Sequence, residues 1–197
     1  MSLSPSILCT GHIELSDEIR SATAGVIIDV VPYIEVYAIS DESTIASIQK
    51  LSMEASVVVF TSFNAVTAVA KCIDSLPTGW TIYCLSGKTR DVVVQHFGEE
   101  PIRGTAADSA TLAAIIANDG IKDAVFFCGN IRMDTLPVLL TESGVRLKEV
   151  IVYFTDTQTT VVGNHNNAIL IFSPSGVRGY FLQNKPGADT TMYALGH

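Results

Sequence analysis

Short apolar segments alternate with helical segments along most of the chain. SVVVFTS at 56–62 and AVFFCGN at 124–130 have the β-branched and aromatic composition of strands, and helical patterns such as NAVTAVAKCIDSL at 64–76 follow them. Strands joined through helices run parallel, and parallel sheets are covered on both faces. The alternation therefore predicts an α/β protein, and 48% hydrophobic residues in a chain of 197 supply enough apolar side chains for its cores.

The chain contains an internal repeat. FTSFNAV at 60–66 and IFSPSGV at 171–177 match in residue class position by position, so that Ser62 corresponds to Ser173. A similar strand follows each copy some twenty residues later, TIYCLSG in the first and TMYALGH in the second. A repeated unit of strand, loop, helix and strand predicts two flavodoxin-like lobes with parallel sheets.

Two extended segments indicate how these lobes are connected. VVPYIEVYAI, which contains a proline that disfavours a central sheet position, and EVIVYFTDTQ flank a middle block of strands and helices. The block is therefore predicted to be inserted into the other lobe. We expect residues 1–40 with 158–197 to form the first lobe, residues 41–150 the second, and segments 31–40 and 148–158 a two-stranded hinge.

The second copy of the repeat stops at Gly196-His197, without a helix after its last strand. The first copy continues into a helix after the corresponding Gly87. We therefore expect the C-terminal part of one lobe to be truncated in this sequence, and the natural protein to extend by roughly 40–60 residues.

Composition argues against several classes of function. The net charge is −8 and no lysine or arginine cluster is present, which disfavours nucleic acid as a partner. No apolar run reaches the roughly 18 residues of a membrane span, and the N-terminus lacks the pattern of a secretory signal, so a cytoplasmic protein is expected. The four cysteines form no CxxC pair and the histidines have no metal-ligand spacing, so we expect reduced thiols and no metal.

Small polar residues end four of the predicted strands, at the sheet edge where ligands of parallel α/β proteins bind. Amides at helix starts favour carboxylates by about 0.3–1 kcal/mol each. Ordinary helix N-caps use the same residue types, so capping alone remains an alternative for each loop. The four loops are Thr61-Ser62, Ser86-Gly87, Gly129-Asn130 and Ser173-Pro174-Ser175-Gly176.

Four segments resemble the uroporphyrinogen-III synthase family: VVFTSFNAV, VFFCGNIRMDTLPVLLTESGV, VIVYFT and ILIFSPSGVRGYF. The resemblance implies two α/β lobes, a two-stranded hinge and an active site in the cleft between the lobes. It also implies the reaction: hydroxymethylbilane, a linear tetrapyrrole with eight carboxylates, loses water and is cyclised to uroporphyrinogen III with inversion of its terminal ring. The family uses no cofactor and no metal.

The resemblance also implies the site residues. Tyr153 matches the family's cleft tyrosine and would donate a proton to the departing hydroxyl, although a tyrosine with a merely structural hydrogen bond is the alternative. The residues that would bind carboxylates, mainly through backbone amides, are Thr61, Ser62, Asn64, Gly87, Thr89, Gly129, Asn130, Ser173, Ser175 and Gly176.

The sequence departs from the family pattern at two of its loops. Gly11 follows Thr10 where the family commonly has an arginine, so one carboxylate-pairing arginine is absent. The loop Gly87-Lys88-Thr89-Arg90 is one residue tighter than the family's, which makes Thr89 a weaker candidate than Ser62.

Two other classes of protein fit parts of the pattern. A non-catalytic two-lobed module that binds a small polycarboxylate would use the same helix starts and hinge. A flavodoxin-like nucleotide binder is disfavoured because neither GxGxxG nor a P-loop is present. The favoured prediction is a monomeric cytoplasmic lyase of haem biosynthesis.

Overall fold

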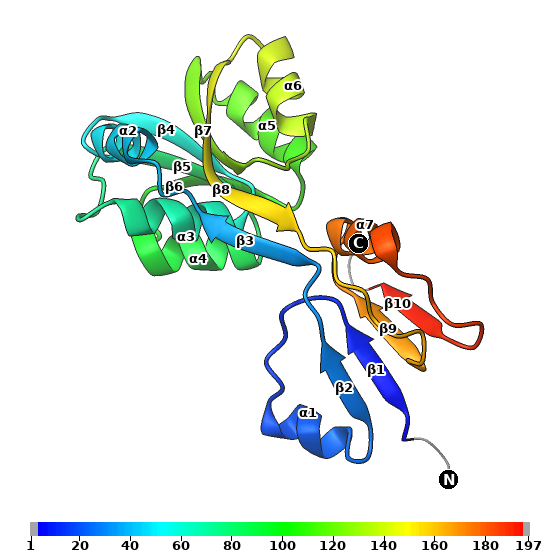
Figure 1. Cartoon of the computed structure of the whole chain (residues 1–197). Helices are drawn as coiled ribbons and strands as arrows, with labels where there is room; N and C mark the ends of the chain where they lie inside the picture. Colours follow the sequence, from blue (N-terminus) through cyan, green and yellow to red (C-terminus); the bar gives the residue numbers. More distant parts are fainter. Residues whose placement is uncertain (1–3, 195–197) are drawn as a thin grey trace. The chain divides into compact units, whose positions relative to one another are not determined.

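The chain forms two compact units (Figure 1). A computed structural model describes residues 4–194, and it divides into unit 1, Met1–Glu35 with Asp156–His197, and unit 2, Val36–Thr155. Both units combine helices with parallel strands, which confirms the predicted fold class. The hinge role expected of 31–40 and 148–158 stays a prediction, and the expected chain end at Gly196-His197 lies outside the described residues.

Unit 1 contains a four-stranded parallel sheet in the order β10-β9-β1-β2. The two C-terminal strands lie beside the two N-terminal strands in this order, because β1 pairs with both β2 and β9. The sheet therefore forms only when these distant segments meet. Its elements are β1 (Ser6–Cys9), α1 (Asp17–Ala22), β2 (Ile27–Val30), β9 (Ala168–Ile171), α7 (Pro174–Gln183) and β10 (Thr191–Ala194).

The core of unit 1 is centred on α7. Tyr180 of α7 packs edge-on against Tyr33, with ring centroids 5.7 Å apart. Helix α7 can approach Tyr33 closely because Gly179 has no side chain. A Cβ at Gly179 would lie 2.9 Å from the Cβ of Tyr33. In contrast to the expected cover on both faces, the six-residue α1 buries none of its side chains. One short amphipathic turn is too small to shield a sheet face.

Unit 2 is built on a six-stranded sheet in the order β3-β8-β7-β4-β5-β6. When the strands β4 to β8 are numbered 1 to 5 along the chain, their order across the sheet from β6 to β8 is 3-2-1-4-5. The order in flavodoxin itself is 2-1-3-4-5. Its elements are β3 (Ile34–Ala38), α2 (Glu42–Ser52), β4 (Ser56–Phe60), α3 (Phe63–Cys72), β5 (Trp80–Leu85), α4 (Lys88–Phe97), β6 (Ile102–Ala106), α5 (Ser109–Asn118), β7 (Asp123–Gly129), α6 (Thr135–Glu142) and β8 (Arg146–Thr157).

Helices cover both faces of this sheet, as Figure 1 shows. Alternate side chains of β4 point to opposite sides: Val58 and Phe60 pack with α2, α3 and α4, whereas Val59 packs with α5 and α6. Strand β7 alternates in the same way. Apolar strands are therefore required here, because most side chains of the central strands β4 and β7 are buried on one face or the other.

The segment that contains Pro32 lies at sheet edges. Strand β2 is an edge of the first sheet and β3 an edge of the second, as the proline predicts. Tyr37 stacks on Phe154, and the amide of Ile39 donates a 3.0 Å hydrogen bond to the carbonyl of Val152. Residue numbers rise along β3 while those of the facing residues in β8 fall, so β3 and β8 are antiparallel.

Strand β6, with the sequence IRGTA, has a glycine at its centre. Its central glycine breaks the apolar pattern, but a Cβ at Gly104 would lie 2.9 Å from the Tyr83 ring. The glycine thus makes room for a buried tyrosine on the neighbouring strand. The extra strand places one more loop at the carboxyl edge of the sheet.

Candidate active site

Three of the predicted loops lie side by side in unit 2. They follow β7, β4 and β5, which are consecutive in the sheet. From β4 the chain passes to β5 and β6 in one direction and then returns to β7 on the other side, so the strand order reverses between β4 and β7. A reversal of this kind opens a crevice at the carboxyl ends of the strands, where α/β proteins bind ligands.

A pocket of about 230 Å³ lies at this edge. Four residues that the sequence predicts for the site contribute to its wall: Thr61, Ser62, Gly129 and Tyr153. Residues from β4, β7 and β8 thus meet around one cavity, although they are separated by up to 92 positions (153 − 61) in the chain. The pocket brings hydroxyl groups and a tyrosine together against an apolar floor that includes Phe126.

Tyr153 has a buried ring and an uncommitted hydroxyl. Its side chain is only 8% exposed and belongs to the core of the α3 and α4 face. Within residues 4–194 its hydroxyl makes no hydrogen bond, whereas the hydroxyls of Tyr33 and Tyr83 both do. A buried tyrosine usually satisfies its hydroxyl. Among the described residues the structural hydrogen bond of the alternative is not formed, and the role of the Tyr153 hydroxyl towards a ligand stays a prediction.

Gly129 fixes the position of the Tyr153 ring. A Cβ at Gly129 would lie 2.5 Å from Cζ and 2.8 Å from Oη of Tyr153. Only glycine leaves room for the ring at this point. Gly129 thus contributes to the site through the space it leaves.

Asn130 is fully engaged with β8. Its side chain accepts a 2.7 Å hydrogen bond from the amide of Thr155 and donates a 3.2 Å bond to the carbonyl of the same residue. Its own amide donates to the carbonyl of Tyr153 at 3.2 Å. The amide expected to face a carboxylate is therefore occupied, and Asn130 holds the β8 backbone beside Tyr153.

Ser62 is the N-cap of α3. Its hydroxyl accepts a 3.2 Å hydrogen bond from the amide of Asn64. The capping alternative thus holds for its side chain, and it also occupies the Asn64 amide that was expected to face a ligand. Ser62 still lines the pocket, where Thr61 precedes it.

The loop after β5 differs from its expected role. Gly87 has φ of +68°, a left-handed conformation that favours glycine, and it is the N-cap of α4. Thr89 is 7% exposed on the inward side of α4 and does not line the pocket. Helix α4 begins at Lys88, so Thr89 lies in its first turn with its side chain buried.

The matching loop of unit 1 repeats the capping arrangement. The Ser173 hydroxyl accepts a 3.1 Å hydrogen bond from the amide of Gly176, at the start of α7. Ser175 is partly exposed in the same turn. Thr10, at the end of β1, donates from its hydroxyl to the carbonyl of Leu170 at 3.0 Å. The internal repeat therefore corresponds to two similar strand-to-helix junctions.

Sequence reasoning missed Arg132 and Ser109, which also line the pocket. Arg132 follows Gly129-Asn130 and forms ion pairs with Asp134 and Glu149. Burial alone would lower its pKa, but hydrogen bonds from its guanidinium to these carboxylates raise the pKa above the usual value. Ser109 begins α5 after β6, so the hydroxyl-after-strand pattern would have found it had β6 been recognised.

The thiol of Cys128 borders the same pocket. Burial raises its pKa, and the negative charge of Glu149 raises it further. The thiol forms part of the pocket wall, and its raised pKa disfavours the reactive thiolate.

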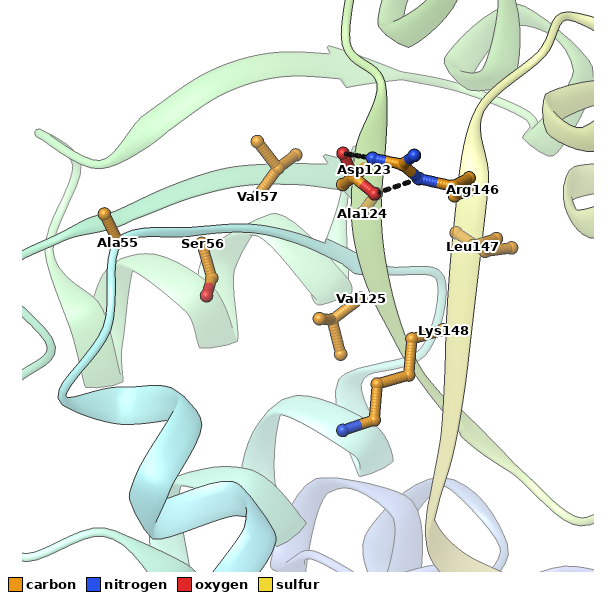
Figure 2. A pocket seen from close by; sticks show the side chains of 9 residues that line it. All are labelled: Ala55, Ser56, Val57, Asp123, Ala124, Val125, Arg146, Leu147 and Lys148. Carbon is orange, nitrogen blue, oxygen red and sulfur yellow. Dashed lines mark hydrogen bonds and ion pairs between the residues drawn. The ribbon is translucent and has the colours of Figure 1, made fainter.

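A second hollow, of about 500 Å³, lies near the opposite ends of the strands (Figure 2). Arg146 forms a bidentate pair with Asp123 there, with both N–O distances at 2.6 Å, and the Lys148 side chain extends along its wall. None of the predicted site residues lines this hollow. Between residues 4 and 194, no group of three acidic, histidine or cysteine side chains is placed to hold a metal ion. Over the same residues, no helix is long and apolar enough to span a bilayer.

Two α/β units, one of them with a tyrosine-bearing pocket at the carboxyl ends of its strands, define a two-lobed α/β protein. Residues 14–197 match the family described as uroporphyrinogen-III synthase HemD. The chain belongs to this family of enzymes of tetrapyrrole (haem) biosynthesis.

Solved structures agree with this assignment. The chain superposes on a mutant uroporphyrinogen III synthase from Thermus thermophilus with a TM-score of 0.70, at 11% identity and with 98% of this chain and 85% of the other covered. For the uroporphyrinogen-III synthetase of Helicobacter pylori the TM-score is 0.67, at 14% identity over 98% and 84%. At these identities the likeness shows the fold. No curated protein sequence matches the chain significantly.

Proposed function

We propose that the chain is a lyase that converts hydroxymethylbilane to uroporphyrinogen III with loss of water and inversion of the terminal pyrrole ring. The observation that carries this proposal is the uncommitted hydroxyl of Tyr153 in the pocket at the carboxyl edge of unit 2. A reaction that removes a hydroxyl as water needs a proton donor at that hydroxyl, and a positioned phenol can supply it.

Tyr153 would donate its proton to the departing hydroxyl, which leaves as water and generates an azafulvene. The far pyrrole ring attacks this carbon, and the resulting spiro intermediate opens and recloses with the terminal ring inverted. The proton returns to the phenolate when the newly bonded ring carbon loses its hydrogen, so that water is the one product besides the macrocycle. The apolar wall of the pocket excludes solvent that would compete for the azafulvene.

The remaining predicted residues would bind substrate carboxylates. In unit 2 we propose Thr61, Ser62 and the backbone around Gly87, and in unit 1 the turn that contains Ser175 and Gly176. We leave Asn130 and Thr89 out of the proposed ligands, since Asn130 is hydrogen-bonded to β8 and Thr89 is buried. The monomeric state and the cytoplasmic location remain predictions of the sequence.

Isomer analysis tests the proposal. The chain is incubated with freshly prepared hydroxymethylbilane, the products are oxidised to porphyrins, and the type I and type III isomers are separated. We expect the type III isomer, and Tyr153→Phe should lower turnover by about 10–100-fold with little change in KM. Tyr37→Phe, at a half-exposed tyrosine, is the matched control. A protein that binds the tetrapyrrole but yields only type I product would be the non-catalytic binding module.

A further inference from the structure

One lysine at the carboxyl edge of unit 2 has no acidic partner. Lys88, the first residue of α4, forms no ion pair within the described residues, whereas Arg90 and Arg132 are each paired with carboxylates. Over the same residues of unit 2, Lys71, Lys122 and Lys148 also form no ion pair. Lys71 lies at the end of α3, Lys122 directly before β7, and Lys148 beside the hollow in Figure 2. Lys88 is thus the positive charge at this edge that no internal acid offsets.

An aromatic ring holds this charge in place. The ammonium of Lys88 lies 3.8 Å from the ring centroid of Phe63. A cation–π contact restrains a flexible lysine, yet unlike an ion pair it leaves the positive charge in force. Phe63 directly follows Ser62, Lys88 directly follows Gly87, and their strands β4 and β5 are paired neighbours. The contact therefore links two of the loops to which carboxylate binding is assigned.

The surroundings give the charge a specific use. The protein carries a net charge of −8, and the cation that lines the pocket, Arg132, is outnumbered by its partners Asp134 and Glu149. A substrate with several carboxylates would be repelled by such a site unless another cation offset the acids. A lysine in the first turn of a helix is also unfavourable with respect to the helix dipole. Its placement costs stability, which a bound carboxylate would recover.

We propose that Lys88, positioned by Phe63, binds a carboxylate of the tetrapyrrole and makes unit 2 specific for polycarboxylate ligands. This inference rests on the proposed function for the identity of the substrate. The role of Lys88 is in affinity, and Tyr153 keeps the role in proton transfer. Removing the charge therefore raises KM and leaves kcat in place.

The test uses two probes. Binding of uroporphyrin III, the oxidised form of the expected product with eight carboxylates, is followed by its fluorescence, and kcat and KM are measured with hydroxymethylbilane. Lys88→Met should raise Kd and KM by about tenfold or more, as for loss of a charge-assisted hydrogen bond, with kcat within about twofold. Lys88→Arg should restore most of the affinity, and Phe63→Leu should produce an intermediate loss. Lys148→Met is the matched control and should change nothing.

Two further readouts separate binding from folding. The Kd of the wild-type chain should rise more steeply with salt than that of Lys88→Met, since one screened charge is missing in the variant. The melting temperature of Lys88→Met should equal or exceed that of the wild type, because the unfavourable helix-start charge is gone. A purely structural lysine would show the opposite: a lower melting temperature and an unchanged salt dependence.

The outcomes distinguish this inference from the proposed function. Suppose that the wild-type chain makes the type III product and that KM is equal for the wild type, Lys88→Met and Lys148→Met. This result overturns only the role of Lys88, and the proposed reaction stands. Uroporphyrin binding that depends on Lys88 without type III product overturns the proposed reaction and keeps the carboxylate site. Absence of uroporphyrin binding to the wild type overturns the role of Lys88 as well.

Discussion

Replacement of Gly129 by alanine tests whether this glycine exists to place Tyr153. The added Cβ would lie 2.5 Å from Cζ, 2.6 Å from Cε2 and 2.8 Å from Oη of the tyrosine. All three distances are shorter than carbon contacts tolerate, and the ring is packed in a core that leaves it 8% exposed. Overpacking of this kind costs about 1–3 kcal/mol. For a unit of this size each kcal/mol lowers the melting temperature by roughly 3–5 °C.

The loss of activity should exceed the loss of stability. A ring displaced by about 1 Å removes the phenol from its position, and misplacement of that size can lower turnover by about 100-fold. We expect Gly129→Ala to reduce kcat by at least tenfold at temperatures where the protein remains folded. The assay combines thermal unfolding with the isomer analysis.

A double-mutant cycle isolates the contact. In a Tyr153→Leu background the shorter side chain leaves room for the new methyl group, so Gly129→Ala should cost much less stability there than in the wild type. Residues in direct contact show such non-additivity, whereas independent sites do not. Equal destabilisation by Gly129→Ala in the two backgrounds would refute the reasoning and leave Gly129 with a role elsewhere in its loop.

Three further perturbations follow from the caps and buried networks. Ser62→Ala should lower stability by about 1 kcal/mol through loss of the α3 cap and change substrate affinity by less, and Asn64→Pro, which removes the amide that donates to this cap, should act in the same way; a large loss of affinity from Asn64→Pro would contradict this. The pKa of Asp41 is lowered from 3.8 to about 2, chiefly because the Ser43 hydroxyl donates to it. The stability that ionised Asp41 contributes is therefore present above pH 4 and is lost as the pH falls towards 2. Asp41→Ala should flatten the dependence of melting temperature on pH in that window, and parallel curves for wild type and variant would refute this prediction. Asn184→Leu leaves two partly buried backbone groups, the amide of Val162 and the carbonyl of Thr160, without their partner and should destabilise unit 1 by about 2 kcal/mol. Unchanged hydrogen exchange in β9 and β10 would count against that prediction.

Local sequence determined the strands and helices whose hydrophobic pattern or capping residue is strong. The β-branched runs of β4 and β7 and the serine caps of α3 and α7 are encoded within about ten residues each, because strand composition and capping depend on near neighbours. The family motifs extended this to the class of enzyme. The likeness of the two strand-to-helix junctions, Ser62 in one unit and Ser173 in the other, is visible in the sequence itself as a repeat.

Tertiary structure alone decided which of these residues face a ligand. The sequence could not show that Thr89 turns inward, that Asn130 is bonded to β8, or that the hydroxyl of Tyr153 is left without a partner among the described residues. Arg132 and the contact between Lys88 and Phe63 were equally hidden. The physical reason is that periodicity records whether a side chain is buried, whereas the partner of a polar group is set by strand order and by segments distant in the chain. The sequence by itself therefore determined the sheet edge at which we propose the chemistry, and the packing of β8 against β7 and of α3 beside α4 decided which groups are without a partner there.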